Sequence, residues 1–166
     1  MSPEPPDFVE FASGRSTQLF RSAYLLAGDW HLAEDLVQTT LGKLYASWRT
    51  VQNADNPVAY AHTVLFRTFV SHKRLRSNRE LPSEQLPEGT APAGDPALRL
   101  ALFEALSKLS PRDRAIVVLR YWEDRSVEET ANVLGVRSGA VRTRSSRALQ
   151  RLRSLLGNDI QEFAEQ

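Results

Sequence analysis

A chain of 166 residues, 42% hydrophobic and 25% charged, has the composition of an ordinary folded protein and room for one medium domain or two small ones. It contains no cysteine, which excludes disulfides and thiolate chemistry and suits a reducing compartment, so we expect a cytoplasmic protein. The net charge of +1 does not mark a nucleic-acid binder, and no apolar run approaches membrane-spanning length.

The first predicted helix extends from residue 7 to the break at Ala27-Gly28-Asp29. Asp29 can cap a second helix, which the apolar spacing predicts from Trp30 to about Trp48. On that helix Asp35, Gln38 and Gly42 lie opposite the apolar face. They form either a docking surface, because glycine lets a partner approach closely, or a solvated helix face, which the residues alone favour.

Thr50–Pro57 is predicted to be a loop from its Asn, Asp and Pro content. Pro57 then opens a third predicted helix, Val58 to about Leu75, whose buried side holds Val58, Ala61, Leu65, Phe69 and His72. The end of this helix, RTFVSHKRLRS, interleaves aromatic and basic residues. That mixture suits either contact with single-stranded nucleic acid or a helix C-terminus complemented by cations, and the residues do not separate the two.

Residues 77–96 lose apolar periodicity and are predicted to form a flexible acidic linker. The fold class is therefore all-α, with a first helical domain at 7–76 and a second at 97–157. The second domain is predicted to begin with a helix at Ala97–Leu109. A further helix is capped by Ser110, has Pro111 in its first turn, and continues to Trp122 with Ile116, Leu119 and Tyr121 in its core stripe.

The stretch from Ser126 to Leu156 has the pattern of a helix-turn-helix. Ser126 and Glu129 form a capping box at the start of a short helix, which Gly135 ends in the left-handed conformation. Ser138 is then predicted to cap a second, longer helix.

The second helix of this motif has one apolar and one basic side. The apolar stripe contains Val141, Ser145, Ala148, Leu152 and Leu155, with Leu149 and Leu156 beside it. The opposite side carries Gly139, Thr143, Ser146, Arg147 and Gln150, flanked by Arg142 and Arg144 and continued by Arg151 and Arg153. No acidic residue interrupts it, which favours DNA recognition over a simple solvated face.

Enzymatic chemistry has little support in this sequence. His31, His62 and His72 show no metal-ligand spacing with acidic residues, and there is no glycine-rich phosphate loop. We therefore expect no catalytic residue, metal or cofactor. A conventional helix-turn-helix regulator remains an alternative, but it would need a ligand pocket or phosphoacceptor domain upstream.

Two segments resemble bacterial sigma factors of the sigma-70 family. HLAEDLVQTTLGKLYASW resembles the characteristic helix of their second conserved region, and LSPRDRAIVVLRYWEDRSVEETANVLGVRSGAVRTRSSRALQRLR resembles their fourth. Two helical domains without a third are similar to the extracytoplasmic-function (ECF) branch. FRSAYLLAGDWHLAEDLVQ and NPVAYAHTV further suggest its sigma-E-like actinobacterial group.

The resemblance implies a promoter-specificity subunit of core RNA polymerase, whose partners are the beta-prime clamp helices, the beta flap and promoter DNA. An anti-sigma factor is a further partner on which the sequence is silent. The implied polymerase-docking residues are Asp35, Leu36 and Gln38. The Thr50–Pro57 loop would receive a base flipped from the minus-10 element. The residues implied for contact with that element are Asn53, Asp55, Tyr60, Arg67, His72, Lys73, Arg74 and Arg76. Those implied for the minus-35 element are Ser138, Gly139, Arg142, Thr143, Arg144, Ser146 and Arg147.

The chain departs from the family pattern at two of these positions. It has Arg67 where relatives usually carry an asparagine, and Tyr60 where they often carry a tryptophan. The resemblance therefore implies a minus-10 role for this helix without fixing its base preference.

Overall fold

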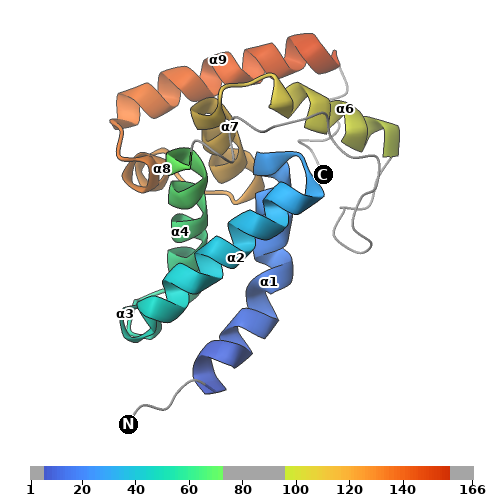
Figure 1. Cartoon of the computed structure of the whole chain (residues 1–166). Helices are drawn as coiled ribbons and strands as arrows, with labels where there is room; N and C mark the ends of the chain where they lie inside the picture. Colours follow the sequence, from blue (N-terminus) through green and yellow to red (C-terminus); the bar gives the residue numbers. More distant parts are fainter. Residues whose placement is uncertain (1–5, 73–95, 158–166) are drawn as a thin grey trace.

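The structure, a computed structural model, describes residues 6–72 and 96–157, and within these ranges it contains helices and no strand (Figure 1). This confirms the all-α fold class. The first half consists of α1 (Pro6–Ala27), α2 (Trp30–Ala46), α3 (Trp48–Gln52) and α4 (Pro57–Ser71). The second half consists of α6 (Pro96–Ser107), α7 (Pro111–Val117), the π-helical turn η1 (Val118–Trp122), α8 (Val127–Leu134) and α9 (Ser138–Leu156).

In the first half, α1, α2 and α4 pack around a common apolar core. The Asp29 side chain accepts a hydrogen bond from the Leu32 N–H at 3.0 Å and caps α2, as predicted. Asn56 caps α4 in the same way, and Pro57 occupies its first turn, where a missing N–H costs nothing. The core is filled by fully buried side chains, which include Leu19, Leu26, Leu36, Leu44, Leu65, Phe66 and Phe69.

The boundaries of α3 and α4 correct two predictions. Thr50–Gln52, predicted to be loop, belong to α3, because Val51 is fully buried and fixes this turn against the core. Only residues 53–56 connect α3 to α4. Helix α4 ends at Ser71 with His72 as its C-cap, earlier than predicted. Lys73, Arg74 and Arg76 lie outside the described residues, as does the predicted linker except Pro96, which is the first residue of α6.

In the second half, Ser110 caps α7 through the Asp113 N–H, as predicted. Ile116 and Leu119 are fully buried, but Tyr121 is 50% exposed and does not belong to the core. The reason is η1, in which the Glu123 N–H donates to the Val118 carbonyl five residues back. This wider turn shifts the helical repeat, so Tyr121 no longer falls on the buried side.

The helix-turn-helix forms as the sequence predicts, with one correction. The Ser126–Glu129 capping box has both hydrogen bonds, and Gly135 ends α8 with a φ of 66°. The N-cap of α9, however, is Arg137, which makes no side-chain capping bond, and Ser138 is the first helical residue.

The apolar stripe of α9 is confirmed for most of its length. Val141, Ser145, Ala148 and Leu152 are buried against the rest of the second half. At the end of the helix Leu156 is buried, whereas Leu155, assigned to the stripe, is 39% exposed. The stripe advances by four residues from Leu152, which places Leu156 rather than Leu155 over the core.

The two halves lie against each other (Figure 1). Helix α4 packs on α7 and α8, and α1 packs on α6, α7 and η1. The boundaries of 7–76 and 97–157, as independently folding domains, remain predictions.

Candidate nucleic-acid interface

The outward side of α9 is an exposed surface of small, hydroxyl and arginine side chains. Gly139, Thr143, Ser146 and Arg147 are exposed, and a Cβ built on Gly139 would meet no atom within 4 Å. Arg142 and Arg144 flank them, also exposed, while Ser138 is half-buried. The structure thus brings all seven residues implied for minus-35 contact to the first half of one helix, where backbone and side chains can approach a major groove.

The two flanking arginines are held by carboxylates of neighbouring helices. Arg142 Nη2 lies 3.1 Å from Glu128 Oε2 on α8, and Arg144 Nη1 lies 3.0 Å from Asp113 Oδ1 on α7. Both pairs are solvent-exposed, so they contribute little stability and can exchange for phosphate or base contacts. Sequence analysis missed these partners because it considered the charges of α9 alone.

A basic groove of about 390 Å³ separates η1 from α9. Arg120, Arg142 and Arg153 line it together with Tyr121, whose hydroxyl lies 3.0 Å from Ser145 Oγ. Ser145, assigned from the sequence to the apolar stripe, therefore joins α9 to η1 by a hydrogen bond. Together with the buried stripe of α9, this contact sets the rotation of the helix and the direction of its outward face.

The residues implied for minus-10 contact divide between the two ends of α4. Asn53 and Asp55 are exposed in the loop before it, and Tyr60 is half-buried in its first turn. Arg67 and the half-buried His72 lie towards the other end. The Arg67 guanidinium donates to two backbone carbonyls of α8, those of Val133 at 2.9 Å and Asn132 at 3.1 Å.

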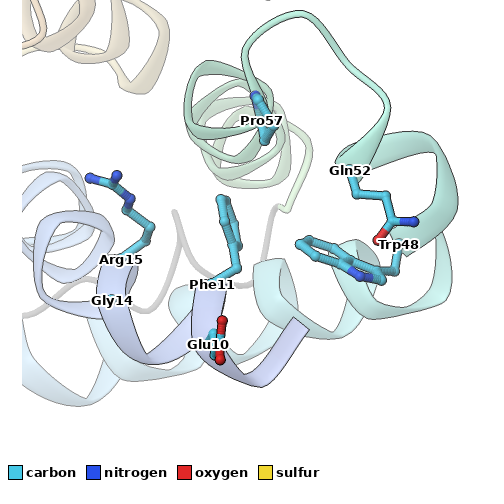
Figure 2. A pocket seen from close by; sticks show the side chains of 7 residues that line it. All are labelled: Glu10, Phe11, Gly14, Arg15, Trp48, Gln52 and Pro57. Atoms are coloured by element: carbon cyan, nitrogen blue, oxygen red, sulfur yellow. The ribbon is translucent and has the colours of Figure 1, made fainter. Parts of the chain in front are cut away.

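An open pocket of about 590 Å³ lies beside the loop before α4 (Figure 2). Phe11 and Trp48 line its floor, with ring centroids 5.3 Å apart, and Gln52 and Pro57 line the side next to the loop. Arg15 lies at its edge, on α1. Aromatic faces and a few polar groups suit a planar base. The sequence alone does not indicate this pocket, because Phe11 on α1 and Trp48 on α3 are far apart in the chain and only the fold brings them together.

The polar face of α2 is open to solvent at Asp35, Gln38 and Gly42. A Cβ built on Gly42 would meet nothing within 4 Å, so a partner helix can lie close to the backbone. Leu36, the third residue implied for polymerase docking, is fully buried in the core of the first half. It therefore supports the helix from inside and cannot itself contact a partner.

Comparison with known proteins identifies both halves. Residues 15–79 match the family description "Sigma-70 region 2", and residues 105–154 match "Sigma-70, region 4". The chain belongs to the sigma-70 family. It is 40% identical over 154 residues to the RNA polymerase sigma-E factor of Streptomyces coelicolor, covering 90% of this chain and 86% of that protein.

Further relatives place this sigma factor in the ECF branch. The ECF RNA polymerase sigma factor SigE of Mycolicibacterium smegmatis is 34% identical over 173 residues, covering 96% of this chain and 65% of that protein. Among solved structures, the sigma factor RpoE of Bartonella quintana in complex with the anti-sigma factor NepR is 28% identical. It matches with a TM-score of 0.73 over 92% of this chain and 98% of its own.

This agreement decides between the function classes that the sequence left open. A chain built from region 2 and region 4, with sigma-E factors as relatives, is a sigma factor that directs promoter recognition, and not a conventional helix-turn-helix regulator. Because the structural match covers both halves at once, they are arranged relative to each other much as in RpoE. In the described ranges, no helix is long and apolar enough to cross a membrane.

Proposed function

We propose that this sigma factor reads the minus-35 element with the outward side of α9, and that this face carries most of its duplex specificity. The supporting observation is that every side chain on that face is exposed, small or cationic, with no carboxylate from α9 itself. Arg142 and Arg147 are the candidates for bidentate contact with guanine. The hydroxyls of Thr143 and Ser146 can either donate a hydrogen bond to a base or accept one from it. Ser138 and Gly139 allow the helix N-terminus to approach a phosphate.

The first half takes the minus-10 element as an opened, single strand. In this proposal the open pocket lined by Phe11 and Trp48 receives the base that is flipped out, and Asn53 and Asp55 contact its edge from the loop. Tyr60 and Arg67 on α4 hold the neighbouring bases and backbone, and His72 continues this path together with Lys73, Arg74 and Arg76. The aromatic lining supports the assignment, because stacking on aromatic rings is the usual way to hold an unpaired base.

The polar face of α2 docks on the beta-prime clamp helices of core RNA polymerase through Asp35 and Gln38. The second half contacts the beta flap, which sets the distance between the two DNA-reading surfaces. This sigma factor performs no chemistry of its own in this scheme and needs no cofactor, since phosphodiester synthesis belongs to the core enzyme. It acts in the cytoplasm, on the nucleoid when bound to polymerase, and an anti-sigma factor is a candidate partner, as NepR is for RpoE.

The test is reconstituted transcription. The purified chain, added to core RNA polymerase from a Streptomyces species, is expected to start transcripts from a genomic fragment library at sites that share two elements. Alanine at both Arg142 and Arg147 is expected to abolish those starts without loss of core binding. Promoter-independent starts, or a chain that binds duplex DNA but never core polymerase, would contradict the proposal.

A further inference from the structure

One carboxylate lies beside the outward face of α9 without belonging to α9. Glu128, in the first turn of α8, accepts a hydrogen bond of 3.1 Å from Arg142 Nη2. The side chain of Glu128 is 68% exposed and that of Arg142 is 62% exposed, so the pair adds little to the stability of the fold. Its effect lies instead in where it holds the Arg142 guanidinium.

The other neighbours of Arg142 repel it. The basic groove between η1 and α9, which Arg142 lines, holds two further cations, Arg120 and Arg153, and no carboxylate is among the described residues that line it. Like charges repel, so these two arginines disfavour a position of the Arg142 side chain inside the groove. In the part of the chain that the structure describes, Glu128 is therefore the carboxylate that anchors this arginine.

A guanidinium anchored in this way keeps most of its hydrogen-bond donors. The bond to Glu128 uses one N–H of Nη2, which leaves the other N–H groups of Arg142 for a bidentate contact with O6 and N7 of a guanine. The side chain has lost part of its rotational freedom before DNA arrives, so less entropy is lost when the guanine is engaged. The anchored arginine is thus prepared for contact with a base.

Contact with a phosphate is affected in the opposite way. If the Arg142 side chain turns towards the DNA backbone, its bond to Glu128 breaks. The carboxylate then stands without its cation beside a polyanion, where it repels the phosphates. The same carboxylate therefore favours one contact of Arg142 and penalises the other.

We propose that Glu128 determines specificity, by positioning Arg142 for a guanine of the minus-35 element and by disfavouring its contact with phosphates. The inference rests on the proposed function, in which Arg142 reads that element. It adds a role for a residue outside the recognition helix. Glu128 contacts the arginine and not the base, so it is a positioning residue.

The test is the base preference of the complex with polymerase. The full chain is combined with Streptomyces core RNA polymerase and bound to a duplex library randomised over the minus-35 element, with flanks from a promoter that reconstituted transcription identifies. Sequencing of the bound fraction gives the preference at each position. Titrations with the preferred duplex and with a duplex scrambled at this element give the two affinities.

Substitutions at Glu128 separate its position from its charge. Glu128→Gln is expected to lower the preference at the position read by Arg142 about tenfold and to raise the affinity for the scrambled duplex about twofold. Glu128→Asp keeps the charge but sets the carboxylate back by one methylene, so the preference should fall without a gain in affinity for the scrambled duplex. Glu104→Gln, which removes an exposed carboxylate from α6, is the control and should change neither.

The Arg142→Ala background shows whether Glu128 acts through Arg142. In that background Glu128→Gln is expected to shift the affinity for all sequences alike and to leave the base preference unchanged, because the arginine that it positions is absent. An equal loss of preference in both backgrounds would overturn the inference. So would an unchanged preference when Glu128→Gln is made in the otherwise wild-type chain.

The outcomes also separate this inference from the proposed function. If Arg142→Ala lowers the preference at one position while Glu128→Gln lowers none, the inference alone fails. If Arg142→Ala leaves every preference intact, or if the wild-type complex selects no sequence, the proposed base contact of Arg142 fails and the inference fails with it.

Discussion

Arg114 Nη1 donates a hydrogen bond of 2.7 Å to the carbonyl of Leu26, linking α7 to the end of α1 across 88 residues of sequence. The same guanidinium donates to the carbonyls of Leu106 and Leu109 at 2.8 Å, and its side chain is almost fully buried. It also lies 5.7 Å from the centroid of the Phe69 ring. One buried cation thus complements the negative ends of two helices from different halves.

We expect Arg114→Lys to lower the free energy of unfolding by about 2–4 kcal/mol, because a single ammonium cannot reach three divergent carbonyls. Urea denaturation followed by circular dichroism measures this directly. The control is Arg112→Lys, at an exposed position two residues earlier on α7. It should change the free energy of unfolding by less than about 0.5 kcal/mol. A loss of stability no larger than that of the control would mean that a lysine at this position satisfies the buried carbonyls as well as the arginine does.

Polymerase docking can be tested on α2. Alanine at Asp35 or Gln38 is expected to weaken binding to core RNA polymerase by at least about 1 kcal/mol, with the helical content unchanged because both side chains are exposed. The measurement is a titration of labelled chain with core enzyme. Glu34→Ala, the neighbouring exposed residue, is the matched control, and equal affinities in all three variants would exclude this face from docking.

Base reading can be separated from phosphate binding along α9. If Arg142 or Arg147 is bidentate to a guanine, its replacement by alanine should cost about 1–3 kcal/mol and relax the preference at one promoter position. Arg151 and Arg153 lie farther along the helix, so their removal should weaken all sequences alike and reduce the salt slope by about one unit.

Binding to a promoter library at two salt concentrations distinguishes these pairs of arginines. If Arg142→Ala and Arg147→Ala both lowered the affinity for every sequence equally, α9 would be anchored mainly through the DNA backbone. DNA shape would then supply the selectivity.

The capping box of α8 makes a pH-dependent contribution to stability. The hydrogen bond from the Ser126 backbone N–H lowers the pKa of Glu129 below its ordinary value of 4.5, and the Ser126 side chain adds to this effect. A depressed pKa contributes stability above pH 4.5 that is lost as the pH falls through the folded-state pKa. Glu129→Gln should therefore lose less stability than wild type between pH 7 and pH 3.5.

Urea titrations at the two pH values provide the comparison, with Glu104→Gln as an exposed control on α6. Ser126→Ala should cost about 1 kcal/mol at pH 7 through loss of the N-cap. If Glu129→Gln and wild type showed the same pH dependence, the capping carboxylate would not be the source.

A protease site inserted at Gly89, outside the described residues, tests whether the halves fold independently. The cleaved pieces are each expected to keep their helical circular dichroism after separation, because each half has buried apolar side chains of its own. The second piece should bind minus-35 duplex weakly and start no transcription. Loss of a single cooperative unfolding transition on cleavage would mean instead that the chain folds as one unit.

Local chemistry explains which parts of this fold could be predicted from the sequence. Asp29, Ser110, Ser126 and Gly135 begin or end helices through bonds made within three or four residues, so their roles follow from spacing alone. The outward face of α9 follows from helical periodicity for the same reason. Ser138 was misassigned because Arg137, with no side-chain bond, takes the N-cap position.

The missed features depend on partners far along the chain. Leu36 lies inside a recognisable docking motif, yet its side chain is fully buried, and only the packing of α1 and α4 reveals this. The carboxylates that hold Arg142 and Arg144 come from other helices. The contact of Glu123 with His62 joins positions 61 residues apart, which no periodicity encodes.

The π-helical turn η1 changes the direction in which successive side chains point in the second half. Before it, Ala115 and Ile116 follow the ordinary helical repeat and are fully buried. Within and directly after it, the i→i+5 hydrogen bond rotates the chain, so that Tyr121 meets α9 and Glu123 meets α1 and α4. The contact of the DNA-binding helix and the contact with the neighbouring half thus both depend on the change of helical phase within this one turn.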